Sequence, residues 1–196
     1  MNIRNLTKID QNIKFYFKAL TLLLIISGTL GFVTALQFPI DTSVAVDKAS
    51  EDLSFIKNLT HLDIFLFILL NNTLKAFIIM LLGVLWGVIP VLFILFNGYA
   101  IGIVTAVVGV NTGFMSILLG TIPHGIFEIY AILLAASYGV WLGEKFVKKL
   151  KNKSIPLVSY IKISVSKFFK IVFPLLILAA LIETFTTRWL LDIFTS

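Results

Sequence analysis

The feature that most constrains this chain is the stretch Ile64–Leu142, which is apolar almost without interruption. Its only acidic, basic or imidazole side chains are Lys75, His124 and Glu128. A helix needs about 20 apolar residues to cross a bilayer, so this stretch has room for about three crossings. So long a run of apolar sequence is not expected in a soluble fold, and we therefore predict a membrane domain.

Composition points the same way. The 196 residues are 59% hydrophobic and 13% charged, with a mean hydropathy of +1.02, whereas a soluble domain averages roughly 25% charged residues. We predict a single all-α domain over 1–196, folded as a polytopic transmembrane helix bundle. The chain has no cysteine, which excludes disulfides, thiolate metal sites and cysteine nucleophiles.

Turn residues divide the chain into about five predicted spans. Gly83, Gly87 and Pro90 mark one break, and the sequence Val110-Asn111-Thr112-Gly113 marks another. The spans are placed near 19–38, 64–84, 89–109, 115–142 and 171–190. The first apolar run, 19–38, exceeds the roughly 7–15 residues of a signal-peptide core, so we interpret it as a retained span.

Two polar segments separate the spans. Residues 39–63 are rich in Asp and Glu and are predicted to be an external loop. Residues 143–170 carry eight lysines against Glu144 and are predicted to be a basic cytoplasmic segment. Its second part has an apolar face that includes Leu157 and Ile161, typical of an interfacial amphipathic helix before the last span. A strand over 160–166 also fits the alternation, but a lone strand beside lipid leaves unpaired edges.

The cations predict the orientation of the chain. Twelve of the 16 Lys and Arg residues lie near the amino terminus or within 144–170. Positive residues favour the cytoplasmic side, so we expect a multi-pass cell-membrane protein with a cytoplasmic amino terminus and an external carboxyl terminus. The net charge of +6 therefore reflects topology rather than binding to nucleic acid.

Polar residues inside the predicted spans are the candidate functional residues, because such groups are costly in lipid and rarely face it. The predicted intramembrane polar cluster consists of Asn71, Asn72, Lys75, Asn97, His124, Glu128 and Glu183. His124 and Glu128 are four residues apart and so lie on one helical face. Small residues at similar spacing predict helix packing at Gly98, Gly102, Gly125, Ala131, Ala135, Gly139 and Gly143.

The chemistry of this cluster admits several interpretations. Its groups can bond across helices in a purely structural role, or they can relay protons or ions. His124 and Glu128 offer two metal ligands at helical spacing, but no His-Glu-x-x-His motif is present, and we predict no metal site. The chain also lacks a Gly-x-Ser-x-Gly motif and a Walker sequence. We therefore predict no catalytic residues, no cofactor and no enzymatic activity.

Several pieces in order resemble one protein family. They are Asn71-Asn72, Asn97-Gly98, His124-Gly125-x-x-Glu128 and Ile182-Glu183-Thr184-Phe185. Together they resemble the stage II sporulation protein M family over about residues 15–192. The resemblance implies about five spans and a role in anchoring or organising partners that remodel the cell envelope. Relatives also occur in organisms that do not sporulate, archaea included, so the resemblance does not imply sporulation itself.

These observations lead to three hypotheses of function. The first is a non-enzymatic membrane scaffold that recruits partners for envelope or membrane remodelling. Its expected partners are membrane lipids and other membrane or envelope proteins, and its small-residue faces also permit a homodimer. The alternative is a permease or channel component, in which the Asn, His and Glu side chains line a path. An intramembrane hydrolase or metalloenzyme is a third and more remote hypothesis.

Overall fold

The structure is a computed structural model that describes residues 3–52, 55 and 59–195. Every regular element among these residues is helical. In order they are α1 (Ile3–Gln37), α2 (Pro39–Asp52), α3 (His61–Leu82), α4 (Val88–Thr112), α5 (Phe114–Gly120), α6 (Ile122–Lys151), α7 (Leu157–Lys167), the π-helical turn η2 (Phe168–Val172) and α8 (Phe173–Thr195).

Five of these helical stretches are long and apolar enough to cross a membrane. They are Gln11–Gln37, His61–Leu82, Val88–Thr112, Ile122–Lys151 and Leu157–Phe185. The prediction of an all-α, multi-pass membrane bundle is thus confirmed.

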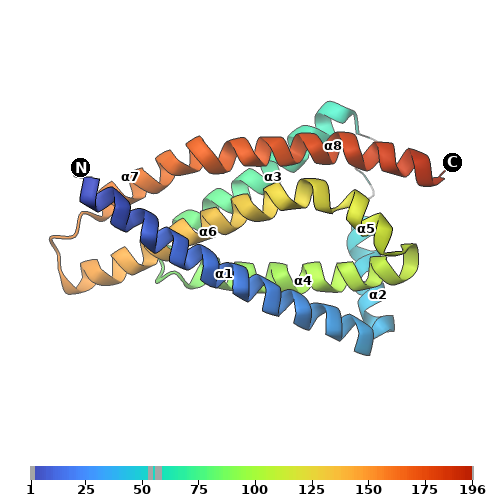
Figure 1. Cartoon of the computed structure of the whole chain (residues 1–196), viewed down its shortest axis with the longest axis horizontal. Helices are drawn as coiled ribbons and strands as arrows, with labels where there is room; N and C mark the ends of the chain where they lie inside the picture. The colour runs from blue at the N-terminus through green and yellow to red at the C-terminus, as the bar shows by residue number, and fades with distance from the viewer. Residues whose placement is uncertain (1–2, 53–54, 56–58, 196) are drawn as a thin grey trace.

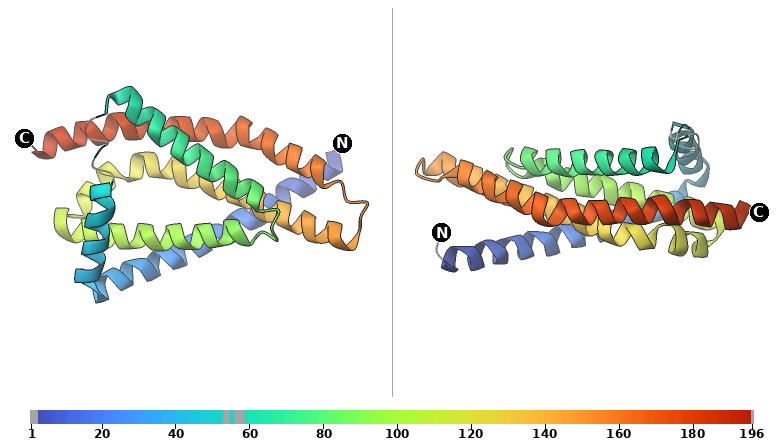
Figure 2. Two further views of the ribbon diagram at one scale, coloured as in Figure 1. Left: turned by 180° about the vertical axis from the view of Figure 1, so that it is seen from behind. Right: turned by 90° about the horizontal axis from the view of Figure 1, so that it is seen from above.

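The long helices run roughly along one axis, so the bundle has two distinct ends (Figures 1 and 2). The start of α1 and the turn between α6 and α7 lie at one end. The crosswise helix α2, the short helix α5 and the end of α8 lie at the other. This arrangement is what five successive crossings require, because an odd number of crossings leaves the two chain ends on opposite sides.

Helix α6 is the centre of the bundle. Half of its most apolar window is buried, against 17–28% for the other four spans. It packs on one side against α3 and α8, which also contact each other, and on the other side against the closely paired helices α1 and α4. Large apolar side chains such as Leu22, Leu74 and Phe96 point outward and are exposed. An apolar outer surface around a packed centre is what lipid as solvent demands.

Local sequence explains where several helices begin and end. Thr60 and Asp63 form a capping box at the start of α3, with the Thr60 hydroxyl oxygen accepting a hydrogen bond from the Asp63 backbone N–H at 3.2 Å. The turn between α3 and α4 places Trp86 and Gly87 in the left-handed region, at φ 55° and 73°. Gly113, at φ 86°, ends α4. Only glycine adopts such backbone angles without steric cost, so Trp86 is the strained residue of the three.

The last span begins earlier than its apolar run suggests. The amphipathic helix α7 continues through η2 directly into α8, so one helical rod extends from Leu157 to the carboxyl-terminal end of the bundle. Pro174 follows η2 and has no N–H to donate to the Lys170 carbonyl. A π turn just before a proline is one way for a helix to absorb that missing hydrogen bond and continue.

Three further boundaries differ from the sequence-based prediction. The predicted loop 39–63 contains the helix α2, which Pro39 opens. The predicted single span 115–142 is divided at Thr121 into α5 and α6. Helix α6 also extends to Lys151, well into the predicted basic segment. Helices extend past an apolar core because backbone hydrogen bonding continues into water, where charged residues such as lysine are good helix formers.

Candidate functional site

The candidate site is built at the start of α6. Pro123 stands in the first turn of this helix, where its missing N–H costs nothing. His124 and Glu128 follow, one turn apart on the same face. The helix therefore presents an imidazole and a carboxylate side by side.

The third member comes from a distant part of the chain. Glu183 of α8 joins His124 and Glu128, and one nitrogen or oxygen atom from each of the three lies within 4.8 Å of the others. All three side chains are partly buried. We call these three residues the His/Glu cluster. It lies toward the end of the bundle that holds α2 and α5, since Glu128 is six residues into α6 and Glu183 two residues from the end of the candidate span Leu157–Phe185.

The polar atoms of the His/Glu cluster have few partners. The buried Nδ1 atom of His124 makes no hydrogen bond. Among the described residues, neither glutamate has a hydrogen bond or a close ion pair, although Lys75 of α3 interacts electrostatically with Glu128. Glu183 and Glu128 also interact electrostatically with each other. The structure thus brings two carboxylates and an unpartnered imidazole together, with one lysine as the neighbouring cation.

Two asparagines of the predicted polar cluster make hydrogen bonds outside the His/Glu cluster. The side-chain amide of Asn71 donates to that of Asn72 at 3.4 Å. Asn97 donates instead to the Phe93 carbonyl of its own helix, α4, at 2.8 Å. In the part of the chain that the structure describes, no hydrogen bond or ion pair joins Asn97 to the His/Glu cluster. The interactions found around the His/Glu cluster join residues of α3, α6 and α8.

Most of the predicted packing residues lie at tight contacts between helices. Ala131 and Ala135 are fully buried. A side chain at Gly139 would meet Pro90, and one at Gly143 would collide with the backbone of Trp86 and Gly87. On α4, a Cβ at Gly98 would collide with the Ser27 side chain and the Leu24 carbonyl of α1, and one at Gly102 would collide with the α1 backbone. Gly125 lies apart from these contacts, since a Cβ there would meet only Thr121 of its own helix, at 3.9 Å.

Sequence reasoning missed a second polar group, at the opposite end of α6. The Tyr16 hydroxyl of α1 donates to Glu144 at 2.9 Å. Glu144 also accepts hydrogen bonds from Lys145, at 3.2 Å, and from Lys148. The four-residue spacing of Glu144 and Lys148 was visible in the sequence. The contribution of Tyr16 was not, because 128 residues separate it from Glu144.

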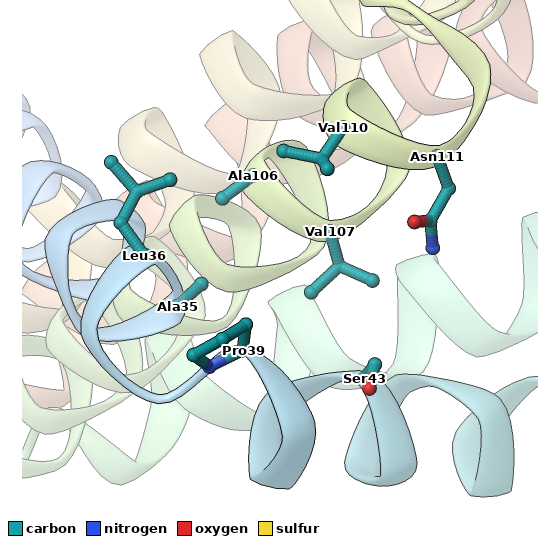
Figure 3. Close-up of a pocket in the computed structure, with 8 residues that line it drawn as sticks. All are labelled: Ala35, Leu36, Pro39, Ser43, Ala106, Val107, Val110 and Asn111. Atoms are coloured by element: carbon teal, nitrogen blue, oxygen red, sulfur yellow. The ribbon is translucent and has the colours of Figure 1, made fainter.

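A cavity of about 200 Å³ lies apart from the His/Glu cluster, between α1, α2 and α4. Its lining consists of Ala35, Leu36, Pro39, Ser43, Ala106, Val107, Val110 and Asn111. Figure 3 shows Val107 and Asn111 of α4 facing Pro39 and Ser43 of α2. The cavity has no acidic, basic or imidazole side chain, so it offers no group for acid–base chemistry.

Comparisons with known proteins place this architecture in context. The family model described as stage II sporulation protein M matches residues 20–188, which include the whole His/Glu cluster. An uncharacterized protein of Methanocaldococcus jannaschii is 31% identical over 129 residues, a match covering 61% of this chain and 68% of that protein. No solved structure matches the chain.

Proposed function

This chain belongs to the stage II sporulation protein M family, and we propose that it is a non-enzymatic membrane scaffold that recruits partner proteins for envelope or membrane remodelling. In this proposal the helical bundle anchors the protein. The partners bind at its ends, and the polar groups within the spans fix how the helices pack.

The observation that carries the proposal is the positive charge exposed at one end of the bundle. Lys148, Lys151 and Lys153 are exposed around the turn between α6 and α7. Glu144 is the sole acidic residue of 143–170, and Lys145 and Lys148 already pair with it. The remaining positive charge has no internal counter-ion among the described residues of this segment. Such a surface attracts anionic lipid headgroups and acidic protein surfaces.

We place this basic end in the cytoplasm of the cell and the opposite end outside the cell membrane. The excess of lysine and arginine at one end supports this orientation. Partners in the cytoplasm would then meet the α6–α7 turn, and partners outside would meet α2 and the loop that follows it.

Crosslinking and affinity purification from native membranes test the scaffold. We expect envelope or membrane proteins to copurify in stable stoichiometry with the wild-type chain. Replacing Lys151 and Lys153 together by glutamine should reduce recovery of cytoplasmic partners several-fold. Lys48→Gln, an exposed lysine on α2, serves as the control and should leave it unchanged. Purification of the chain without any partner would contradict the proposal.

A second candidate function is a permease or channel component. The convergence of His124, Glu128 and Glu183 within apolar helices favours it, since acidic groups inside membranes often mark pathways. Flux into liposomes that contain the purified protein is the test. Flux that Glu128→Gln and Glu183→Gln abolish would support a path through the cluster. Without flux in the wild-type protein, this candidate fails.

A further inference from the structure

We propose that the His/Glu cluster binds one divalent transition-metal ion, of the Zn²⁺ or Mn²⁺ class, between α6 and α8. The inference goes beyond the scaffold role and is independent of it. It starts from the third ligand, which residue spacing did not indicate: Glu183 joins His124 and Glu128 from a helix more than 50 residues later.

The geometry is close to that of a bound ion. Nitrogen and oxygen ligands lie about 2.0–2.2 Å from tetrahedral zinc, and so lie roughly 3.3–3.6 Å from one another. The three ligand atoms here lie within 4.8 Å of one another. Side-chain shifts of about 1 Å would bring the ligand atoms to these separations. Such shifts break nothing, because none of the three side chains is held by a hydrogen bond within the described part of the chain.

The donor set defines the class of metal. One imidazole nitrogen and two carboxylate oxygens suit zinc, manganese and ferrous iron. Calcium and magnesium prefer sites made wholly of oxygen. Soft thiolate ligands are absent because the chain has no cysteine. Three protein ligands leave at least one coordination position for water or for a ligand group from another molecule.

Charge gives an independent reason for a cation at this place. Two carboxylates this close to each other inside apolar helices cannot both remain ionised without compensation. Lys75 supplies a single positive charge, and its side chain is exposed. A divalent ion would neutralise both carboxylates and would also give a partner to the imidazole of His124, whose buried Nδ1 atom makes no hydrogen bond.

The test uses the full-length protein, purified in detergent, freed of its affinity tag and stripped with a chelator. We expect titration with Zn²⁺ and with Mn²⁺, followed by calorimetry and elemental analysis, to give one ion per chain. Co²⁺ should bind with the visible absorption spectrum of nitrogen and oxygen ligation. Glu128→Gln and Glu183→Gln should each weaken binding at least about 100-fold, more than the roughly 10–100-fold typical of losing a group that merely supports a ligand.

Two further variants separate metal binding from general effects. Glu144→Gln makes the same substitution on the same helix, outside the cluster, and should keep both the stoichiometry and the affinity. Lys75→Gln removes the competing cation and should tighten binding. The proposal is overturned if the wild-type protein binds no Zn²⁺, Mn²⁺ or Co²⁺. It is equally overturned if the bound ion is retained in Glu128→Gln and Glu183→Gln.

Discussion

Tyr16 and Glu144 show how a single residue can link helices that are far apart in sequence. The Tyr16 hydroxyl of α1 and two lysines of α6 converge on one carboxylate. The Glu144 side chain keeps 21% of its surface exposed, so solvent screens part of this interaction. The hydrogen bond nevertheless ties the start of α1 to the central helix at the basic end of the bundle.

Tyr16→Phe should therefore reduce the free energy of unfolding by about 1–2 kcal/mol, because a hydrogen bond to a charged group is lost while the ring is kept. Thermal unfolding in detergent measures the change. Tyr130→Phe is the matched control and should be neutral, since the Tyr130 hydroxyl makes no hydrogen bond with the described residues and its ring is exposed. Equal stability of the two variants would contradict the assigned role of Tyr16.

At the scale of elements, glycines decide how α1 and α4 pair. A Cβ at Gly31 would collide with the Tyr99 backbone, and one at Gly102 with the backbone of Gly28 and Phe32. Where no side chain intervenes, two helices in lipid approach until their backbones touch, and dispersion forces stabilise that contact. Gly98 and Gly102 were predicted to pack, whereas Gly28 and Gly31 on the opposing helix were not.

Gly102→Ala should destabilise the bundle by about 1–3 kcal/mol, because the new methyl group must push two backbones apart. Gly125→Ala provides the comparison on α6. Its added methyl group meets only Thr121, at an ordinary contact distance, and alanine is the better helix former, so stability should stay level or rise by up to about 1 kcal/mol. Unfolding in detergent reports both values. A stable Gly102→Ala protein would mean that α1 and α4 are not in backbone contact.

At the scale of the whole molecule, the arrangement of the five spans defines two ends but not which one faces the cytoplasm. The α6–α7 turn and the start of α1 share one end, whereas α2 and α5 share the other (Figure 1). In an orientation experiment, all positions at one end should therefore lie on the same side of the membrane. Positions at the other end should lie on the opposite side.

Labelling of introduced cysteines tests the orientation without background, because the native chain has none. Ser50→Cys and Thr112→Cys place a thiol at the end predicted to be external. Asn152→Cys places one in the turn between α6 and α7. An impermeant thiol reagent added to intact cells should label positions 50 and 112, and position 152 only after permeabilisation. The reverse pattern would invert the topology.

The sequence by itself determined the helical class, the approximate number of spans and the breaks at Gly83–Gly87 and Gly113, because these follow from local hydropathy and backbone freedom. It also singled out His124, Glu128 and Glu183. Only the tertiary structure decided that these three meet, whereas Asn97 donates to the Phe93 carbonyl of its own helix. In lipid, hydrophobicity does not distinguish one apolar helix face from another. Which faces meet depends on shape complementarity between distant segments. The hydropathy pattern along the sequence does not contain this information.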